Sequence, residues 1–576
     1  MFQRVFLGLA LLLLCQCKEE VIVAPPTPYA LTFIDGPVET FETARVQQES
    51  FLHAKVDRPF SYTDSFFNGA TGPFSLTGNL RGLSFNTGSG LIQGTPTSSL
   101  NVGPVTFNYS SAGIQISSQP LSFPILGDLH PPVGSEMGVR EVLNQDVTGD
   151  GVKIAISDTG LEIRHEDLRD NVIPNGSRNY LDGRRDPTLS SPGSQGCHGT
   201  AVAGVIAMTG WNSKGGRGVA PYASIAGLNY LEGQSKKPSL SNMFLLDQAE
   251  GPFDIFNQSW GASLSYWLPV DTVPAFNWYV QKLRSGTTQL RGGKGAIYVK
   301  AAGNSADYNA ALDVFQRSPY VIPVGALDSN NRKASYSSSG SNLWISALGR
   351  PINTTFSGDN YATGYQGTSF AAPAVSGAVA LILQENSELT WREVKYILAK
   401  TAQRVEPTDT GWVTNKAGFH FNNHFGFGKI QADRAVQLAK TFPTGSLGPF
   451  EFFDSVVQGP SQPQIFEENL EIELNVSREI TLEAVALEVD ISHGTPHQLS
   501  LELTSPSVGG TPGTKSVLMG NSSKAYSNPN IPGIAFLSNA FYGEPSSGTW
   551  KFSISNASGT AGALNRFKLH LYGYNR

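Results

Sequence analysis

The feature that most constrains the fold is an alternation, between about residues 126 and 440, of short apolar runs with Ala-rich stretches of helical pattern. Such an alternation predicts a parallel sheet with helices on both faces, an α/β domain that we bound at residues 126–444. The run Val152–Ser157 has the pattern of a buried strand and is followed by Asp158. Functional groups collect beyond the carboxyl ends of strands in open α/β sheets, which makes Asp158 a candidate site residue.

Further polar side chains stand at comparable places. His198 precedes the small-residue helical stretch 201–208, Asn304 ends an apolar run, and Ser369 opens an apolar helical stretch, 370–383. At a helix N-terminus, free N–H groups and the dipole favour developing negative charge. Each motif alone is common as a cap or turn. Together they supply an acid, a base, an amide donor and a hydroxyl nucleophile, in the order Asp, His, Asn, Ser.

This order is that of subtilisin, and the surrounding sequence resembles the subtilisin-like serine peptidases. The matching segments are SDTG (157–160), HGTAVAG (198–204), AAGN (301–304) and GTSFAAP (367–373). Within that family the chain is most similar to the kexin/furin branch. The segments that carry this closer resemblance are GKGAIYVKAAGN (293–304), LTWREVKYIL (389–398) and AGFHFNNHFGFG (417–428).

The resemblance implies a serine endopeptidase. Ser369 would attack the scissile carbonyl, His198 would take the proton and return it to the leaving amine, and Asp158 would orient and stabilise the imidazolium. Asn304 and the backbone N–H of Ser369 would bind the oxyanion, and such an Asn contributes about 10²–10³ in turnover.

Ser259, Trp260 and Gly261 resemble the edge at which the family pairs with an extended substrate through main-chain hydrogen bonds. Kexin and furin carry acidic residues just after this tripeptide to bind basic side chains. Residues 262–270 (ASLSYWLPV) contain none. We therefore expect a broader, more apolar preference, against the alternative of a convertase that cleaves at paired basic residues.

Calcium is the expected cofactor. Asp167, nine residues after Asp158, matches a calcium ligand of the family, and Asn212 lies in a glycine-bearing loop that follows the His198 helix. Hard oxygen ligands on such a loop suit Ca²⁺. Asp307 and Asp313 roughly match acids of the branch's second calcium site, with a pair of solvated loop acids as the alternative reading.

Other cofactors find no support in the sequence. His420 and His424, like His493 and His497, are four residues apart, but neither pair has the Glu of H-E-x-x-H, so we expect no zinc. No Walker-type or G-x-G-x-x-G loop opens a helix, so we expect no nucleotide. Ser338 stands where the kexin branch has a Glu of its second calcium site.

The first 17 residues predict export, because a short positive start precedes the apolar run Val5–Leu14, which is too short for a membrane span of about 20 residues. The sequence Leu14-Cys15-Gln16-Cys17 resembles a bacterial lipoprotein signal with Cys17 as the lipidated residue, and ordinary secretion is the alternative. We expect an extracytoplasmic protein, secreted or lipid-anchored to a bacterial membrane. Residues 18–28 predict a proline-bearing tether.

Residues 29–125 alternate strand-like runs with turns, which predicts an N-terminal β-sandwich. The stretch GLSFNTGSGLIQGTPT (82–97) resembles the Ig-like (cadherin-like) domains of bacterial surface proteins. This resemblance implies a spacer or a module that binds a cell-surface or matrix ligand. No Arg or Lys lies between Gln115 and Val139, so the domain either stays attached or is removed at a site without basic residues.

Beyond a predicted linker, 445–453, residues 454–576 return to short alternating strands. The segments SLELTSPSVGG (500–510) and FYGEPSSGTWKFSI (541–554) resemble the P (Homo B) domain, a jelly-roll-type β-sandwich that follows the peptidase domain in the kexin branch. The implied role of this domain is to stabilise the peptidase.

Composition excludes several classes of protein. Lys and Arg number 41 against 47 Asp and Glu, so no basic surplus favours nucleic acid. Of three cysteines, two lie in the export segment, which excludes a disulfide framework. Cys197 is either a reactive thiol or a small apolar filler. The remaining rival to the endopeptidase is a surface adhesion or scaffold protein with an inactive peptidase domain, which the complete set of candidate catalytic residues disfavours.

Overall fold

The computed structural model describes residues 133–575 except 190–196, 233–251, 262–273, 307 and 523–527. Before residue 133 it describes only short segments between residues 54 and 126. The export segment with Cys17, the tether, Asp307 and residues 262–270 therefore lie outside the described residues.

The centre of the molecule is a six-stranded parallel sheet in the order β11-β10-β12-β13-β14-β15. Its strands are β10 (Lys153–Ser157), β11 (Ser224–Leu228), β12 (Ile255–Gln258), β13 (Ile297–Ala301), β14 (Val321–Leu327) and β15 (Ile345–Leu348). Every residue of β12, β13 and β14 is buried. Near-continuous apolar strands are typical of a parallel sheet covered on both faces, as the sequence predicts.

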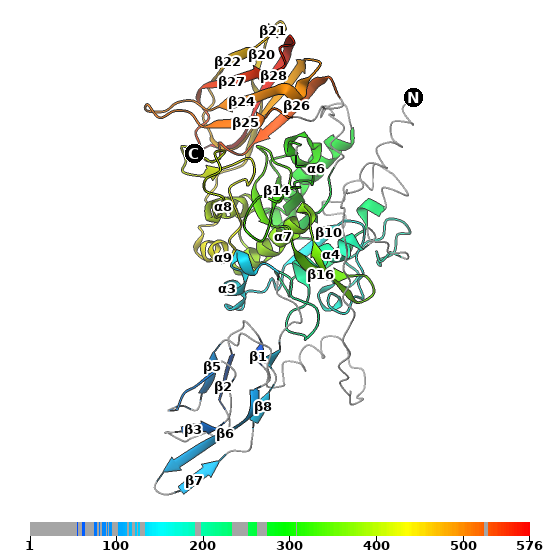
Figure 1. Cartoon of the computed structure of the whole chain (residues 1–576), viewed down its shortest axis with the longest axis vertical. Coiled ribbons are helices and arrows are strands. Elements are labelled where there is room, and N and C mark those ends of the chain that lie inside the picture. Colours follow the sequence, from blue (N-terminus) through cyan, green and yellow to red (C-terminus); the bar gives the residue numbers. More distant parts are fainter. Residues whose placement is uncertain are drawn as a thin grey trace.

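Helices cover both faces of this sheet (Figure 1). The helices are α3 (Val139–Leu143), α4 (His198–Ala207), α6 (Pro274–Gln289), α7 (Thr368–Glu385), α8 (Trp391–Thr401) and α9 (Ala432–Thr441). On β12, Asn257 accepts a hydrogen bond from Ser376 of α7, while its neighbour Gln258 accepts one from Tyr279 of α6. Because consecutive side chains of a strand point to opposite faces, α6 and α7 lie on opposite sides of the sheet.

Small residues let the helices approach their neighbours closely. A Cβ at Gly204 of α4 would lie 2.3 Å from the Thr354 hydroxyl, so only glycine permits this contact. Thr354 belongs to β16 (Ile352–Phe356), which forms a two-stranded antiparallel sheet with β17 (Asn360–Tyr365). A second small sheet pairs β18 (Val413–Thr414) with β19 (His420–Phe421).

The C-terminal part is an antiparallel β-sandwich, which confirms that element of the predicted fold (Figure 1). One sheet has the order β20-β28-β23-β26, with β21 paired to β28, and the other β22-β27-β24-β25. The strands are β20 (Glu451–Gly459), β21 (Gln464–Phe466), β22 (Asn469–Val476), β23 (Thr481–Ser492), β24 (Leu499–Thr504), β25 (Lys515–Met519), β26 (Asn530–Ser538), β27 (Gly548–Asn556) and β28 (Gly562–Tyr574). Leu487, Trp550 and Phe552 lie in the core between the sheets, fully buried. Strand β20 begins at Glu451, inside the predicted linker.

Short strands are described in the N-terminal region. They are β1 (Ala54–Lys55), β2 (Phe60–Thr63), β3 (Phe74–Thr77), β4 (Ser84–Phe85), β5 (Leu91–Gly94), β6 (Val102–Ser111), β7 (Ile114–Ser117), β8 (Leu121–Phe123) and β9 (Ile125–Leu126). Most pair antiparallel, in sheets of the order β2-β5-β4 and β3-β6-β7. An Ig-like sandwich for residues 29–125 remains a prediction. Among the residues described, no helix is long and apolar enough to cross a membrane.

Candidate active site

The candidate acid and base lie in direct contact. Asp158 follows β10 at the carboxyl edge of the sheet and is completely buried, and its Oδ1 lies 2.7 Å from Nδ1 of His198. The same oxygen accepts the backbone N–H of Thr159 at 2.7 Å. The contact places a proton on Nδ1, so a neutral His198 ring carries its lone pair on Nε2, where a general base needs it.

The sequence around His198 explains how this contact forms. His198 is the first residue of α4, and a Cβ on the next residue, Gly199, would lie 2.0 Å from the carbonyl oxygen of Gly160. The N–H of Gly199 donates to the Thr159 hydroxyl at 3.1 Å. Helix α4 therefore begins directly against the turn that follows Asp158, and the missing side chain of Gly199 permits the close approach.

Ser369 lies in the first turn of α7, after Gly367, whose φ of 147° favours glycine. Its hydroxyl donates to the carbonyl oxygen of Ser259 at 3.2 Å. The ring of His198 packs 5.8 Å from the ring of Phe370, the residue after Ser369. The structure thus brings the beginnings of α4 and α7 together at the edge of the sheet where β10 ends.

Asn304 lies three residues after β13 and is bound to the same turn. Its Oδ1 accepts hydrogen bonds from the backbone N–H and the hydroxyl of Thr368, at 2.9 and 2.8 Å. A Cβ built on Gly367 would lie 3.4 Å from Asn304 Nδ2 and 3.6 Å from the backbone nitrogen of Ser369. Two nitrogens therefore border one small volume beside the nucleophile, an arrangement that can stabilise an oxyanion.

The candidate substrate edge follows β12. The Ser259 hydroxyl donates to the carbonyl oxygen of Ser369 at 2.8 Å, which places this segment beside the candidate nucleophile. The indole Nε1 of Trp260 donates to the carbonyl of Ser157 at 2.9 Å, next to Asp158. Gly261 completes the segment, and a Cβ there would lie 2.6 Å from Asp313 Oδ2.

Sequence reasoning missed a charged residue behind this edge. Lys300 of β13 is completely buried, donates to the carbonyl of Trp260 at 2.6 Å, and lies 3.7 Å from the centre of the Trp260 indole. Burial lowers the pKa of Lys300 to about 7, and the negative charge of Asp313 opposes that shift. The only signal in the sequence is a single lysine inside the apolar run IYVKAA (297–302).

The first predicted calcium pair is brought together. Asp167 is completely buried, its Oδ1 accepts from Asn212 Nδ2 at 2.5 Å, and its carbonyl accepts from the N–H of Thr209 at 2.9 Å. Within the described parts of the chain, no group of three or more His, Cys, Asp or Glu side chains is arranged to hold a metal ion. A metal ion at Asp167 would therefore need backbone carbonyl and side-chain amide oxygens as ligands in addition to the Asp167 carboxylate.

The second predicted pair cannot be assessed as a pair, because Asp307 is outside the described residues. Asp313 is buried, and accepts hydrogen bonds from the N–H of Phe315 at 2.9 Å and from Gln316 Nε2 at 3.0 Å. The alternative of a solvated loop acid is therefore wrong for Asp313, because helix-capping contacts hold it inside the protein. Cys197 is also buried, as an apolar filler would be.

Family models match both principal parts of the chain. Residues 149–428 match the subtilase family, and residues 482–571 match the proprotein convertase P-domain. The first range contains the four candidate catalytic residues and the whole six-stranded sheet, and the second lies within the C-terminal sandwich.

Several known proteins are similar over most of the described chain. An extracellular serine protease of Aeromonas sobria is 29% identical over 527 residues, which cover 75% of this chain and 82% of the relative. Human proprotein convertase subtilisin/kexin type 7 is 31% identical and Saccharomyces cerevisiae kexin 29% identical, each over 76% of this chain. The match spans 58% and 54% of the length of those two relatives. A crystal structure of the Aeromonas sobria serine protease matches with a TM-score of 0.66 and 25% identity, over 76% of this chain and 91% of that one.

Proposed function

We propose that this chain, which is a subtilisin-like serine endopeptidase of the subtilase family, hydrolyses peptide bonds of exported or extracellular proteins with Ser369 as its nucleophile. The observation that carries the proposal is the 2.7 Å contact between Asp158 and His198 at the carboxyl edge of the sheet. Ser369 lies in the first turn of α7, and the next residue, Phe370, packs against the His198 ring.

The chemistry follows from these positions. His198 Nε2 takes the proton of the Ser369 hydroxyl as the oxygen attacks the scissile carbonyl, and Asp158 stabilises the imidazolium that forms. Asn304 Nδ2 and the Ser369 backbone N–H donate to the oxyanion of the tetrahedral intermediate. The proton on His198 then passes to the leaving amine as the peptide bond breaks, which leaves an ester between Ser369 and the acyl group. A water molecule next gives a proton to His198 and attacks that ester, and His198 returns the proton to the Ser369 oxygen as the carboxylic acid is released.

For substrates, we propose extended polypeptides that pair with the edge at Ser259, Trp260 and Gly261. The absence of acidic residues from 262–270 disfavours basic side chains. The proposed preference is therefore broad and apolar. A peptide library tests it, and efficient cleavage restricted to sites after paired basic residues would establish the convertase alternative instead.

For calcium, we propose a structural ion held by Asp167 and Asn212. The donor types suit Ca²⁺, because carboxylate and amide oxygens are hard ligands. In this structure Asn212 turns its Nδ2 toward Asp167 and its Oδ1 toward the N–H of Lys214, so ion binding would require the amide to reverse. When bound, the ion would tie the loop after α4 to the segment around Asp167. No such role is proposed for Asp313, which already receives two hydrogen bonds from within the chain.

For location, we propose export from the cytoplasm, with Cys17 as a lipid-anchored first residue. The relative from Aeromonas sobria is named an extracellular protease. Detergent partitioning of the wild type against Cys17→Ala tests the anchor, and equal partitioning would eliminate lipidation at this residue. We propose the Ig-like region 29–125 as a spacer or a module for a surface ligand, and residues 454–576 as the P domain.

The assignment is tested with residues 18–576 in a casein-cleavage assay with calcium. Ser369→Ala should lower turnover by about 10⁶-fold, as removal of the nucleophile does in subtilisin. Ser446→Ala, an exposed serine in the loop before β20, serves as the matched control and should leave turnover unchanged. Chelation should weaken activity and heat resistance.

Equal, negligible activity of wild type and Ser369→Ala would favour an inactive scaffold over a peptidase. Intact-mass analysis of the same samples would distinguish that outcome from a missing maturation cleavage. The purified protein could also be incubated with an extract of the cells that normally produce it, which would supply any missing maturation protease. If its mass then stays unchanged and it does not react with a fluorophosphonate, the peptidase assignment is eliminated.

A further inference from the structure

A chain of buried polar side chains lies beneath Ser369. Ser376 donates to Asn257 Oδ1 at 2.8 Å, Asn257 Nδ2 donates to the Ser259 hydroxyl at 2.9 Å, and the Ser259 hydroxyl donates to the Ser369 carbonyl at 2.8 Å. All these residues are at most 1% exposed. The chain therefore runs from the middle of α7 across the end of β12 and back to the beginning of α7.

The direction of these hydrogen bonds is fixed at one end. The carbonyl of Ser369 can only accept, so the Ser259 hydroxyl must donate to it. The Ser259 oxygen then accepts from an N–H of Asn257, which turns the amide oxygen of Asn257 toward Ser376. With the amide reversed, Asn257 would present an acceptor to Ser259 and compete with Ser369 for its proton. The bond from Ser259 to Ser369 thus selects the amide orientation, and the Ser376 hydroxyl stabilises it by donating to the amide oxygen that faces α7.

The two ends of this chain lie on the same face of α7. Ser369 and Ser376 are seven residues apart, two helical turns or about 10 Å along the axis. The rest of this helix is predominantly apolar, and apolar side chains would fill the same space without the cost of burying polar atoms. A fully hydrogen-bonded buried network of this kind fixes geometry rather than adding stability.

The geometry it fixes is that of the reaction site. Ser259 and Ser369 are joined twice, because the Ser259 hydroxyl binds the Ser369 carbonyl and the Ser369 hydroxyl binds the Ser259 carbonyl. Ser259 begins the substrate edge, and the Ser369 N–H is an oxyanion donor. In the proposed mechanism the Ser369 hydroxyl leaves the Ser259 carbonyl and donates its proton to His198. The contact of the Ser259 hydroxyl with the Ser369 carbonyl therefore holds the nucleophile relative to the substrate edge.

We propose that Asn257 and Ser376 are positioning residues that act through Ser259 to hold Ser369 at the correct distance from the substrate edge. The proposal rests on the proposed function, because it takes Ser369 as the nucleophile and Ser259–Gly261 as the substrate edge. Neither residue touches the substrate, so both affect catalysis only through the placement of Ser369.

The test compares Asn257→Ala, Ser376→Ala and the double variant in the assay with residues 18–576. Reactive sites are counted with a fluorophosphonate, so that kcat is expressed per titrated nucleophile. We expect Asn257→Ala to lower kcat by about 10–100-fold with KM nearly unchanged, since a misplacement of about 1 Å costs up to about 10². Ser376→Ala should lower kcat less, and Ser376→Thr, which keeps the hydroxyl, should restore it.

The double variant provides the sharpest criterion. Ser376 acts only through Asn257, so adding Ser376→Ala to Asn257→Ala should lower kcat no further, whereas independent sites would combine their effects. Ser346→Ala is the matched control, because Ser346 is equally buried and donates one hydrogen bond, to the carbonyl of Phe425, which does not belong to the chain from Ser376 to Ser369. It should reduce heat resistance without changing kcat per site.

Lower heat resistance of Asn257→Ala with an unchanged kcat per titrated site would overturn the proposal and leave a purely structural role. If Asn257→Ala does not fold, the comparison of Ser376→Ala with Ser376→Thr replaces it. An equal kcat per titrated site in these two variants would likewise overturn the proposal. Failure of the proposed function is recognised separately, since the wild type would then show no activity that depends on Ser369.

Discussion

Lys300 places an ammonium group where water is excluded. The side chain extends from β13 toward Trp260, with Phe315 on a second side at 5.5 Å, and its three possible donors face a carbonyl and aromatic rings. A buried ammonium is costly, so burial lowers its pKa to about 7, although the charge of Asp313 opposes that shift. Lys300 in the folded protein therefore changes its charge near neutral pH.

This burial predicts how stability depends on pH. Below about pH 7, Lys300 is protonated in the folded and unfolded states, and the fold bears the full cost of the buried charge. Between about pH 7 and the ordinary lysine value near 10.4, the unfolded chain binds a proton that the folded chain lacks. The free energy of unfolding should therefore rise with pH by up to about 1.4 kcal/mol per unit.

Lys300→Met removes this contribution, because methionine carries no charge at any pH. On a Ser369→Ala background, which prevents self-digestion, urea unfolding at pH 7, 8 and 9 should show the parent protein gaining stability relative to the Lys300→Met variant at each step. The difference isolates Lys300, because other titrating groups are common to both proteins. Lys294→Met, at a partly exposed lysine, is the control. Parallel pH curves for Lys300→Met and its parent would contradict the prediction.

The contrast between Lys300 and the candidate catalytic residues shows what sequence can predict at this scale. Asp158, His198 and Ser369 stand beside glycines and other small residues whose spacing is local, so the motif is visible along the chain. Lys300, by contrast, binds a carbonyl 40 positions away, and Asn257 accepts from a hydroxyl 119 positions away. Strand periodicity indicates which face such a side chain occupies, but not which helix or ring covers it.

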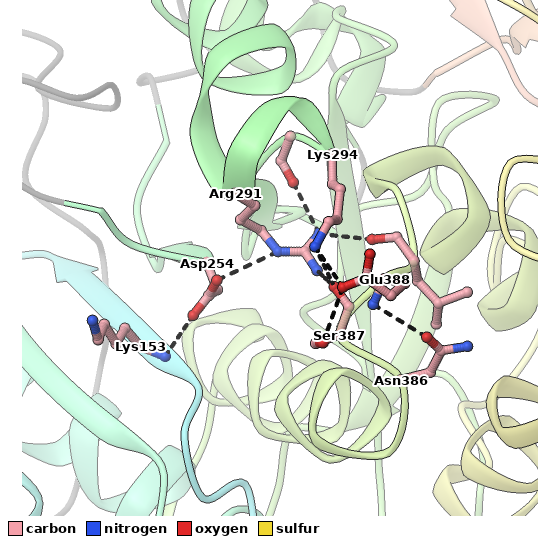
Figure 2. Close-up of polar contacts among 9 residues, drawn as sticks. Lys153, Asp254, Arg291, Lys294, Asn386, Ser387 and Glu388 are labelled. Atoms are coloured by element: carbon pink, nitrogen blue, oxygen red, sulfur yellow. Dashed lines mark hydrogen bonds and ion pairs between the residues drawn. The ribbon is translucent and has the colours of Figure 1, made fainter.

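At the scale of elements, a cluster around Arg291 holds the far end of the sheet (Figure 2). Its guanidinium donates to the carbonyls of Ser387 and Leu389, both at 2.9 Å, and lies 3.4 Å from Asp254. Asp254 in turn accepts the backbone N–H of Lys153 at 2.9 Å. One side chain thus joins the turn after α7 to the beginnings of β10 and β12, opposite the edge that carries Asp158.

Arg291→Met should therefore destabilise the peptidase domain strongly. Removing the guanidinium deletes the hydrogen bonds to the Ser387 and Leu389 carbonyls and the charged partner of Asp254. Because Asp254 is about a quarter exposed and keeps its bond from the Lys153 N–H, the loss should stay below the cost of about 3–5 kcal/mol for a fully buried pair. Lys294→Met is the matched control. Lys294 lies beside Arg291 and pairs with the exposed Glu388 at 2.8 Å, and solvent screening makes such a surface pair contribute little to stability. Urea unfolding midpoints on the Ser369→Ala background provide the measurement, and equal shifts for the two variants would contradict the expectation.

The elements themselves were largely predictable, and their order was not. Apolar runs predict β10 and β13, and the all-apolar stretch 370–383 predicts most of α7. The order β11-β10-β12 depends on packing between segments that are far apart in the sequence. No local sequence pattern indicates which strands become neighbours. The position of Arg291, at a φ of 54° before two glycines, likewise follows from the turn it closes against α7.

At the scale of the whole molecule, polar contacts join the peptidase domain to the C-terminal sandwich. Arg392 of α8 forms a buried ion pair with Glu483 of β23, with Nε to Oε1 at 2.9 Å. Asn415 donates to the carbonyls of Ala540 and Tyr542, each at 2.9 Å. These contacts disfavour separation of the two domains. If the domains separated, the buried charges and the amide would lose the partners that they have across the boundary.

Glu483→Gln tests whether the two parts unfold as one. The change keeps the shape of the side chain but leaves the Arg392 guanidinium buried without its counter-charge, a loss of about 3–5 kcal/mol for such a pair. On the Ser369→Ala background, calorimetry should show the single transition of the parent divided into two, with the peptidase domain unfolding first. Glu502→Gln removes a pair with Lys515 on the exposed side of the sandwich and should leave one transition. One unchanged transition for Glu483→Gln would mean that the ion pair is dispensable to joint unfolding, and that the remaining contacts, such as those of Asn415, hold the parts together.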